Sequence, residues 1–264
     1  FDEVNSSVVS EFLDEVMKGI TAKVFRTCHA TETVGKKLDQ LKIDKNAPEY
    51  QKKHVATMAN LEAAITCNHK RTIPKTWAQS LQRQKDRLKE RKKKAKENQK
   101  KYTQRIKDAE RKHKEMILKY ETKILSDQEK LKEHQKDLKD REAQGKTTKG
   151  VKNRILSKKK AIKTTRERIK KRKNKHKERI EKLKAGKENR RLRDQASIEK
   201  ASLQIEAKEL TKDYNLNTSL KSYIDPRIYY DWSKKVDYDW RRYYSKSLQR
   251  KYSWIDPEKP LEEK

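Results

Sequence analysis

The sequence is poor in cysteine, glycine and proline, and it has no long apolar runs. Its 264 residues include 2 cysteines, 5 glycines and 5 prolines. Two cysteines are too few for a disulfide framework and favour a reducing, intracellular setting. No stretch approaches the roughly 18 apolar residues that a transmembrane helix needs, and we expect no signal peptide. These absences disfavour secreted and membrane-spanning proteins.

Signatures of cofactor and metal sites are also missing. There is no P-loop or Rossmann glycine pattern, and no set of carboxylates typical of a two-metal nuclease. Cys28, His29, Cys67 and His69 could in principle bind zinc. However, no C-x-x-C spacing occurs, and the adjacent Cys28 and His29 cannot easily bind one ion. We therefore expect no metal site and no cofactor.

Charge dominates what is present. Only 31% of the residues are hydrophobic, 42% are charged, and the formal net charge is +32. Such an excess of cations indicates a polyanionic partner, because neutralising phosphates releases counterions and drives binding. Nucleic acid fits best. A membrane surface fits poorly, because the basic segments lack a wide apolar face.

Residues 1–77 have the composition of a globular domain. Apolar residues at 8–17 recur at helical spacing and predict an amphipathic helix, capped by Asn5 or Ser6. A second helix is expected to start at Ala30–Val34, and a third to run from Pro48 to Asn68. The first residue is Phe1, and FDEVN is typical of the middle of a domain, so we expect a fragment of a longer protein.

Residues 78–212 predict a long antiparallel coiled-coil hairpin. Glycines at 145 and 150 mark a turn between two helices of roughly 60 residues, each about 90 Å long. The seam is thin, because most heptads carry one apolar residue where a stable dimer uses two. The seven-residue steps are Leu81, Leu88, Ala95, Tyr102, Ala109 and Met116, then Ile117, Ile124, Leu131 and Leu138, then Ile155, Ile162, Ile169, His176 and Leu183, then Ala196, Leu203 and Leu210.

Aromatic residues return in 213–264 and predict a small helical module. Tyr223 precedes Asp225-Pro226, which is a plausible start of a helix. A tyrosine nucleophile needs positive charge around it, because the phenol pKa is near 10. Lys221 and Arg227 are close in sequence and could supply that charge. The alternative is that Tyr223 is simply a packing or surface residue.

Two further groups could bind a phosphate. Lys23 and Arg26 are three residues apart, on one face of a helix, and could flank one phosphate. His69 follows an apolar helical run and precedes Lys70-Arg71. The alternatives are an exposed cation pair of little energetic value and a histidine that caps a helix.

Three blocks together resemble eukaryotic-type DNA topoisomerase IB, in order and in approximate spacing. They are FDEVN…GITAKVFRTCHAT, then AITCNHKRTIPKT, then TSLKSYIDPRI…QRKYSWID. The resemblance implies a mainly α fold with the helical end of a catalytic core at 1–77, a coiled-coil linker at 78–212 and a C-terminal domain at 213–264. It also implies Tyr223 as nucleophile, and Arg26 and His69 as catalytic residues, with Lys23 as a supporting phosphate contact.

The activity implied by this resemblance is relaxation of supercoiled double-stranded DNA, without ATP or metal, through a 3′-phosphotyrosyl intermediate. The resemblance also implies a monomeric enzyme that lies with DNA in a nucleus, or in the cytoplasm of an archaeon. Its further catalytic arginine and lysine would lie before Phe1, so the chain alone is expected to be inactive.

Three features depart from the family pattern. The family usually has Ser-Lys-x-x-Tyr, whereas here Lys221 is moved by one position. Ser222 stands where asparagine usually precedes the tyrosine, which leaves sensitivity to camptothecin-type poisons open. The predicted linker is also longer than expected for the family.

Two other functions compete with this interpretation. A non-enzymatic, basic coiled-coil protein that binds nucleic acid is favoured by composition alone, but the three blocks argue against it. A tyrosine recombinase shares the chemistry, but the long basic hairpin before the tyrosine disfavours it.

Overall fold

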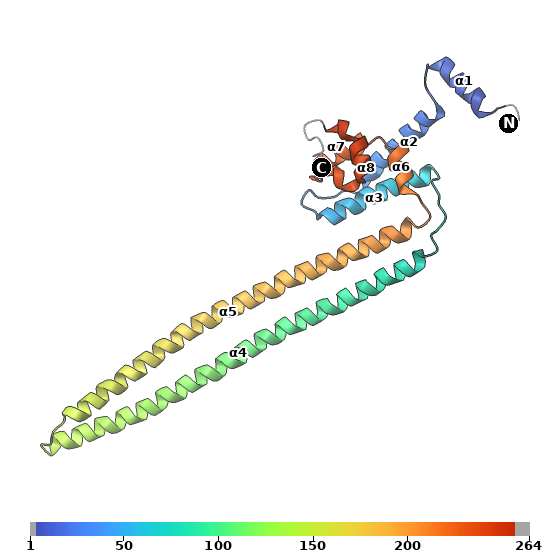
Figure 1. Cartoon of the computed structure of the whole chain (residues 1–264). Coiled ribbons are helices and arrows are strands. Elements are labelled where there is room, and N and C mark those ends of the chain that lie inside the picture. Colours follow the sequence, from blue (N-terminus) through green and yellow to red (C-terminus); the bar gives the residue numbers. More distant parts are fainter. Residues whose placement is uncertain (1–3, 257–264) are drawn as a thin grey trace. The chain divides into compact units, whose positions relative to one another are not determined.

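The computed structural model describes residues 4–256, and this part of the chain is built from helices without a sheet, as predicted (Figure 1). Phe1–Glu3, which open the FDEVN block, lie outside the described residues. None of the helices in 4–256 has the length and apolar content needed to cross a membrane. The elements are α1 Ser6–Val16, α2 Ala22–Gln40, α3 Glu49–Thr66, α4 Trp77–Ala143, α5 Lys149–Leu210, α6 Leu216–Ser222, α7 Arg227–Val236, η1 Trp240–Tyr243, α8 Lys246–Lys251 and η2 Ser253–Ile255.

The chain divides into two units. The first, called the compact unit below, combines residues 1–90 with 197–264. The second, called the hairpin unit, is the stretch 91–196. Each of the long helices α4 and α5 contributes one end to the compact unit and the rest to the hairpin unit.

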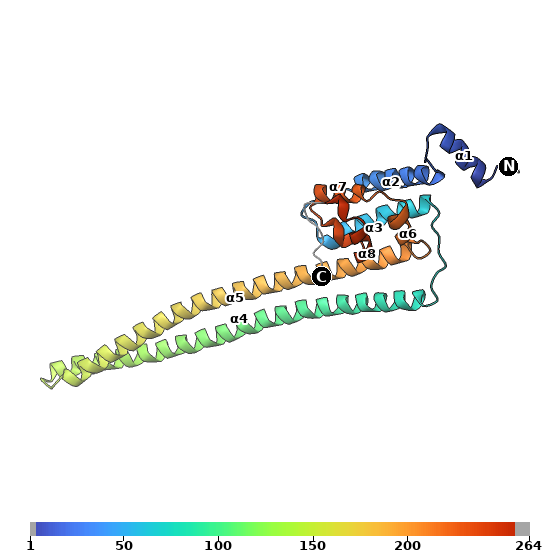
Figure 2. The ribbon, with the colours of Figure 1, turned by 45° about the horizontal axis from the view of Figure 1, so that its top comes forward.

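The core of the compact unit joins the two ends of the sequence. Helices α2 and α3 pack against the C-terminal segment that begins with α6 (Figures 1 and 2). The two helices contribute mostly small side chains, and the segment from α6 to η2 contributes mostly aromatic ones. Small residues let two helices approach closely, and large aromatic rings then fill the remaining space at high packing density. The buried members are Ala30, Val34, Leu38, Ala56, Ala59, Ala63, Cys67, Leu220, Ile224, Tyr229, Trp232, Val236, Tyr238, Trp240, Tyr244, Leu248, Tyr252 and Ile255.

Two buried polar groups connect α3 to the C-terminal segment. Tyr229 is 1% exposed, and its hydroxyl donates to the carbonyl oxygen of Ala56 at 3.3 Å. Lys52 is 5% exposed, and its ammonium group donates to the carbonyl oxygens of Lys45 at 2.7 Å and Asp237 at 2.8 Å. Asp237 caps the C-terminus of α7, where a cation is favourable beside the helix dipole.

The N-terminal helices differ from prediction in one respect. Asn5 caps α1 as predicted, because its side-chain oxygen accepts from the backbone N–H groups of Ser7 and Val8. The expected helix start at Ala30–Val34 is wrong, because α2 begins at Ala22 and continues to Gln40. No proline interrupts this stretch, so the polar Thr27–His29 region remains helical.

The apolar side of α1 is left open. Phe12 is 62% exposed and Val16 is 69% exposed, although both belong to the predicted amphipathic pattern. The sequence pattern therefore predicted the helix correctly, but the described residues do not cover its apolar side.

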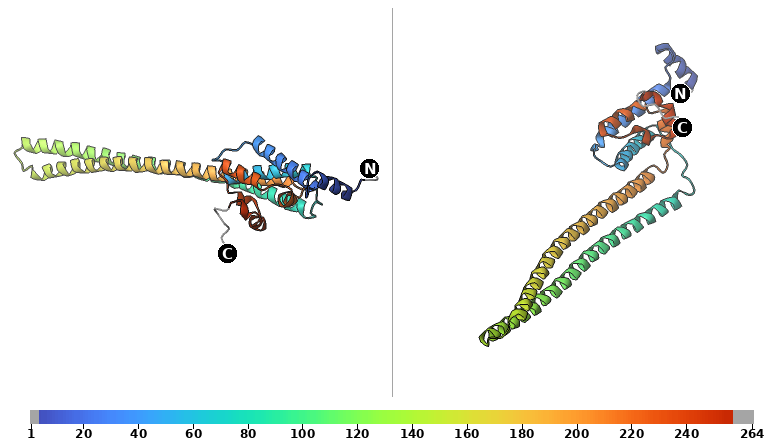
Figure 3. Two further views of the ribbon diagram at one scale, coloured as in Figure 1. Left: turned by 90° about the horizontal axis from the view of Figure 1, so that it is seen from above. Right: turned by 60° about the vertical axis from the view of Figure 1, so that its left-hand side comes forward.

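The hairpin prediction is confirmed. Helices α4 and α5 have 67 and 62 residues and are joined by a turn in which Gly145 has a φ of 70°. Partners across the seam run in opposite directions along the two helices, since Asn98 meets Asp194 and Asp127 meets Lys158. The views of the hairpin unit in Figures 2 and 3 show the two helices side by side.

The seam of the hairpin unit is thin and partly polar, as its sequence predicted. Ile155 and Ile162 are buried, but so is Asp127, whose carboxylate accepts from Lys158 Nζ at 2.6 Å. The rings of His113 and His176 stack across the seam, with centroids 3.8 Å apart and planes tilted by 2°. Such a seam aligns two helices, but it buries far less apolar surface than the aromatic core of the compact unit.

Candidate active site

His69 is positioned by the end of α3. The helix ends with Asn68 in the left-handed region, at a φ of 53°. The backbone N–H of His69 donates to the Ala64 carbonyl at 2.8 Å, and that of Asn68 donates to the Ile65 carbonyl at 2.9 Å. These two bonds form a Schellman motif, which turns the chain sharply at a helix end. Asparagine tolerates the left-handed conformation better than most residues, so the Asn68-His69 pair is suited to this turn.

A short backbone ladder then brings His69 to the start of α6. Lys70 and Tyr214 form an isolated antiparallel bridge. On either side of it, Arg71 N–H donates to the Asp213 carbonyl and Asn215 N–H donates to the His69 carbonyl, both at 2.8 Å. Two segments that are more than 140 residues apart in sequence are thereby held side by side in the compact unit.

Helix α6 holds Tyr223 at its C-terminal end. Tyr223 caps the helix, and its N–H donates to the Ser219 carbonyl at 3.0 Å. The carbonyls of the last turn would otherwise lack partners. The Tyr252 hydroxyl donates to the Leu220 carbonyl at 2.9 Å, and Lys251 Nζ donates to the Lys221 carbonyl at 2.9 Å. The backbone just before Tyr223 is therefore held from the C-terminal segment.

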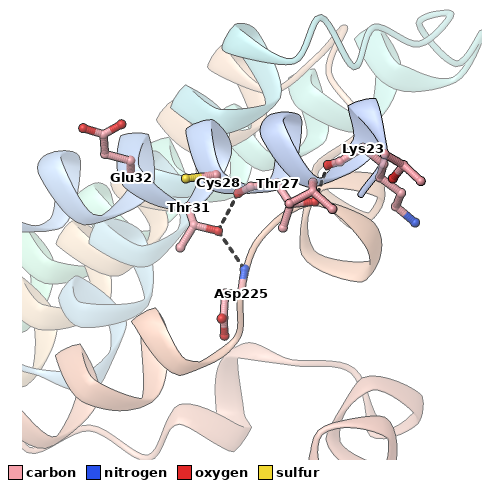
Figure 4. Close-up of a pocket in the computed structure, with 8 residues that line it drawn as sticks. Lys23, Thr27, Cys28, Thr31, Glu32 and Asp225 are labelled. Atoms are coloured by element: carbon pink, nitrogen blue, oxygen red, sulfur yellow. Dashed lines mark hydrogen bonds between the residues drawn. The ribbon is translucent and has the colours of Figure 1, made fainter. Parts of the chain in front are cut away.

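The residues after Tyr223 are attached to α2. The backbone N–H of Asp225 donates to Thr31 Oγ1 at 2.9 Å, and the Thr31 hydroxyl donates to the Thr27 carbonyl at 2.8 Å (Figure 4). This contact joins the Tyr223 segment to the helix that carries Lys23 and Arg26. Tyr223 thus sits where α2, the end of α3 and α6 meet.

All four predicted site residues come together in the compact unit. The ring centroids of His69 and Tyr223 are 4.7 Å apart and tilted by 39°. The Arg26 guanidinium carbon lies 4.9 Å from the centroid of the Tyr223 ring, and Lys23 Nζ lies 5.8 Å from it. Three sequence segments therefore place two cations and one imidazole around a single phenol.

The electrostatics of the site favour a neutral imidazole. Burial, together with the Arg26 charge, lowers the pKa of His69 from its usual value. A guanidinium N–H of Arg26 donates to the Cys67 carbonyl, just before the turn that carries His69. Arg26 and His69 are consequently held by the same end of α3. A neutral imidazole can donate one hydrogen bond and accept another.

One of the two sequence neighbours expected to supply positive charge, Arg227, is engaged by a carboxylate. Arg227 pairs with Asp225, with its Nε atom 3.0 Å from both carboxylate oxygens. This pairing lowers the pKa of the Asp225 carboxyl group. The cations beside the Tyr223 ring are instead Lys23 and Arg26, which lie nearly 200 residues earlier and reach the ring only through folding.

Sequence reasoning missed Ser219, which touches His69 directly. Its Oγ atom lies 2.8 Å from His69 Nδ1, and the residue is 0% exposed. The only available signal was its position one helical turn before Tyr223, which places it on the face of α6 that leads to the tyrosine.

A pocket of about 630 Å³ lies along α2, beside the Tyr223 segment (Figure 4). Its lining combines Lys23 with the carboxylates of Glu32 and Asp225, so it is not a uniformly basic phosphate site. The remaining lining residues are Thr21, Val24, Thr27, Cys28 and Thr31.

The four residues weighed as zinc ligands are not grouped. Cys28 is exposed on α2, whereas Cys67 is buried in the core. Within residues 4–256, no cluster of three His, Cys, Asp or Glu side chains has the arrangement needed to hold a metal ion.

Two family profiles match the two parts of the sequence that build the compact unit. The profile of the eukaryotic DNA topoisomerase I catalytic core matches residues 1–102. The profile of the C-terminal topoisomerase domain matches residues 195–260. Tyr223, His69, Arg26 and Lys23 all lie within these matched ranges.

Whole-chain relatives agree with the profiles. DNA topoisomerase 1 of Candida albicans is 32% identical over 270 residues, which covers 96% of this chain and 34% of the relative. DNA topoisomerase 1 of Drosophila melanogaster is 28% identical over 254 residues, which covers 96% of this chain and 18% of the relative. DNA topoisomerase 1 of Xenopus laevis is 42% identical over 82 residues, 31% of this chain and 10% of the relative.

The chain spans only about a fifth to a third of the length of the relatives that match it throughout. Both family profiles nevertheless match in the order that the three sequence blocks suggested. The chain belongs to the eukaryotic DNA topoisomerase I family.

Proposed function

We propose that this chain forms part of a type IB DNA topoisomerase, which relaxes supercoiled double-stranded DNA by cutting and resealing one strand. The observation that carries the proposal is the meeting of Tyr223 with His69 and Arg26, within 5 Å between ring or guanidinium centres. A non-enzymatic DNA-binding protein has no need to bring these three side chains together from three distant segments.

In the proposed cleavage step, the phenol oxygen of Tyr223 attacks the phosphorus of a DNA phosphodiester as the phenol proton is lost. An oxygen–phosphorus bond forms between Tyr223 and the 3′ end, and the bond from phosphorus to the 5′ oxygen breaks. That oxygen takes up a proton and leaves as a 5′ hydroxyl. One phosphodiester replaces another, so no ATP is needed.

Arg26 and His69 would donate hydrogen bonds to the nonbridging phosphate oxygens. Charge on these oxygens builds up in the crowded transition state, and donors placed in advance stabilise it. Lys23, whose ammonium group lies 5.8 Å from the Tyr223 ring, would support the same phosphate.

The covalent bond would hold one end of the cut strand while the free 5′ end rotates about the intact strand. Attack by the 5′ hydroxyl on the phosphotyrosine then restores the DNA and releases Tyr223. The proton donor for the leaving 5′ oxygen is, by family resemblance, a lysine upstream of Phe1, which works with a second arginine. We therefore propose that the chain needs this upstream part for activity.

DNA binding is proposed to depend strongly on the hairpin unit. Residues 91–196 hold 42 lysines and arginines against 16 aspartates and glutamates, a net charge of +26.

Relatives from fungi, animals and plants are all eukaryotic, which supports a nuclear location for this protein. The family profiles favour a topoisomerase over a tyrosine recombinase, and relaxed rather than recombined plasmid is the expected product.

The test is to trap the covalent complex. Full-length protein is mixed with supercoiled plasmid, denatured with detergent, and examined for protein joined to DNA 3′ ends. Tyr223→Phe should bind DNA normally and form no adduct, because the ring remains and only the nucleophile is lost.

Tyr230→Phe is the matched control, because Lys234 Nζ lies 4.0 Å from the Tyr230 ring and that tyrosine is also flanked by a cation. This variant should form the adduct at the normal rate. An adduct that survives in Tyr223→Phe would assign the nucleophile to another residue.

A further inference from the structure

Ser219 is a buried serine whose only side-chain hydrogen bond among the described residues is to the proposed catalytic histidine. The residue is 0% exposed, and its Oγ atom lies 2.8 Å from His69 Nδ1. We propose that Ser219 is a positioning residue, which donates its hydroxyl proton to His69 Nδ1 and thereby holds His69 in the tautomer that carries its proton on Nε2. The catalytic consequence rests on the function proposed above.

The direction of this hydrogen bond follows from the burial of the serine and from the place of the imidazole. A hydroxyl group that accepts from an Nδ1–H must place its own proton on another acceptor. Ser219 is closed off from water, and its Oγ atom makes no second hydrogen bond to residues 4–256. Either tautomer leaves one buried donor without a partner among the described residues, Ser219 O–H or His69 Nε2–H. Only the imidazole lies beside the proposed nucleophile, where a DNA phosphate can accept from Nε2, so the Ser219 proton is assigned to His69 Nδ1.

The proton of His69 is then left on Nε2. The imidazole is predominantly neutral near pH 7, since burial and Arg26 both oppose its protonation. A neutral imidazole has one N–H, and the hydrogen bond at one nitrogen decides which nitrogen carries it. Because Nδ1 accepts from Ser219, Nε2 is the donor.

His69 Nε2 is a donor without a partner in the compact unit. The atom is buried and makes no hydrogen bond to any described residue. Its ring centre lies 4.7 Å from that of Tyr223. A buried unsatisfied donor is uncommon in a folded protein, and one beside the proposed nucleophile is well placed to be satisfied by a phosphate oxygen of the DNA. The other tautomer would present a lone pair to that oxygen and repel it.

Ser219 also links the histidine to the nucleophile through its backbone. Its carbonyl oxygen accepts from the N–H groups of Tyr223 and Ile224, both at 3.0 Å. One residue of α6 therefore holds the imidazole through its side chain and the Tyr223 backbone through its carbonyl. Loss of the hydroxyl alone should release the imidazole and leave the backbone contacts of Tyr223 in place.

The first test reads the tautomer directly, in this chain and without DNA. Nitrogen-15 NMR of the imidazole should show His69 with a protonated Nε2 and an unprotonated Nδ1. In Ser219→Ala the two nitrogens should shift towards the averaged values of a mixed tautomer population, and Ser219→Thr, which restores a hydroxyl, should return them towards the wild-type values.

Ser233→Ala is the matched control. Ser233 is also buried, at 3% exposed, and its hydroxyl donates to the Tyr230 carbonyl at 2.7 Å, without contact to a histidine. This variant should leave the His69 nitrogens unchanged. A wild-type His69 protonated on Nδ1, or a Ser219→Ala spectrum that keeps the wild-type pattern with tryptophan fluorescence showing a folded chain, would overturn the inference.

The second test measures single-turnover cleavage by the full-length protein. Ser219→Ala should slow cleavage about 10-fold with unchanged DNA affinity, less than the roughly 10²–10³-fold cost of removing a donor outright. In a His69→Ala background the same change should have no further effect, since both act through one imidazole. Additive losses would overturn the inference.

The two tests separate this inference from the proposed function. Failure of Tyr223→Phe to abolish the adduct would reject the proposed chemistry, whereas the tautomer measurement would still report on Ser219 and His69. Conversely, a normal adduct with an unchanged tautomer in Ser219→Ala would reject only the role of Ser219.

Discussion

The compact unit and the hairpin unit are both helical, but they differ in net charge and in the kind of core they contain. Residues 1–90 and 197–264 carry 30 lysines and arginines against 24 acidic residues, a net charge of +6. Residues 91–196 are fewer but carry +26. The compact unit has a contiguous aromatic core, whereas the buried side chains of the hairpin unit are few and include Asp127 and Thr165 in its seam.

This difference separates the two kinds of interaction with DNA that the proposed function requires. Attraction to a polyanion is a long-range effect that needs many cations and little geometric precision. Transesterification needs a few groups held to within fractions of an ångström. The chain concentrates its net charge in a rod with little core, and it holds the proposed catalytic groups where a dense core fixes them.

The largest expected effect concerns the division of charge. Replacing residues 91–196 with a short flexible linker removes 42 cations and should sharply reduce the salt dependence of binding. An intact chain that makes 6–10 phosphate contacts would lose about 10³–10⁵-fold in affinity between 50 and 200 mM salt. Fluorescence anisotropy with a labelled duplex measures affinity at each salt concentration. The slope of log affinity against log salt is then compared between the intact chain and the deletion variant.

A slope that survives the deletion would place the DNA-binding charge in the compact unit instead. The full-length protein with the same deletion should still cleave DNA in a single turnover, because no proposed catalytic group lies in 91–196.

The next effect tests the precision of the compact unit. Arg26→Ala and His69→Ala should each slow cleavage by about 10²–10³-fold, because each removes a donor that acts on the transition state. DNA affinity should stay nearly unchanged, since it is spread over dozens of other cations. Single-turnover cleavage with excess full-length protein measures the rate.

Lys36→Ala is the control for this prediction. Lys36 lies on the same helix α2 as an exposed cation, with its Nζ atom 2.7 Å from Glu32. Its loss should leave the cleavage rate unchanged. Normal rates for both Arg26→Ala and His69→Ala would show that their closeness to Tyr223 has only a structural meaning.

A smaller effect compares the stability of the two units. Tyr229→Ala in the compact unit should cost about 3–5 kcal/mol in the free energy of unfolding, as for other large aromatic core residues. Ile162→Ala in the hairpin unit should cost about 2 kcal/mol, at the lower end of the range for aliphatic truncations, because its seam is thin.

Two optical signals separate the units in a urea titration. All four tryptophans, at 77, 232, 240 and 254, lie outside 91–196, so their fluorescence reports on the compact unit. Circular dichroism at 222 nm is dominated by the long helices. Tyr229→Ala should shift the fluorescence transition and Ile162→Ala the dichroism transition. Coincident shifts in both variants would mean that the units unfold together.

The smallest effect is the pH dependence of each unit. The pKa of His69 is lowered by burial and by Arg26, and that of His113 by burial and then by His176, Arg172 and Lys173. The unfolded chain therefore binds protons first as the pH falls through about 6.5, and stability should decline below that pH. The contribution of these two neutral histidines to stability is fully present above about pH 6.5. It is lost as the pH falls through their folded-state pKa values.

Substitution with glutamine assigns this decline to one unit at a time. His69→Gln should flatten the pH dependence of the fluorescence transition, and His113→Gln that of the dichroism transition. An unchanged decline after both substitutions would assign it to other titrating groups, such as the remaining histidines or the carboxylates.

The sequence by itself predicted a mainly helical chain with a long hairpin, although it misplaced the start of α2. The heptad steps predicted α4 and α5, because a seven-residue apolar period is a local property of a helix face. Every residue of that series except Leu210 is buried or half-buried. From the residues alone, Tyr223, Arg26, His69 and Lys23 were candidates with bland alternatives, and their site roles came from the resemblance of three sequence blocks to a known family. The structure brings all four together.

Only the tertiary structure decided what surrounds Tyr223. Arg227 is near it in sequence but pairs with Asp225, while Lys23 and Arg26 reach the ring from α2. The only sequence signal for Ser219 is its place one helical turn before Tyr223, and its hydroxyl acquires a role only where α6 meets the turn after α3. Local periodicity specifies which face of a helix is buried, but the partners of that face depend on how distant segments pack, and a single sequence does not encode these contacts in any short-range pattern.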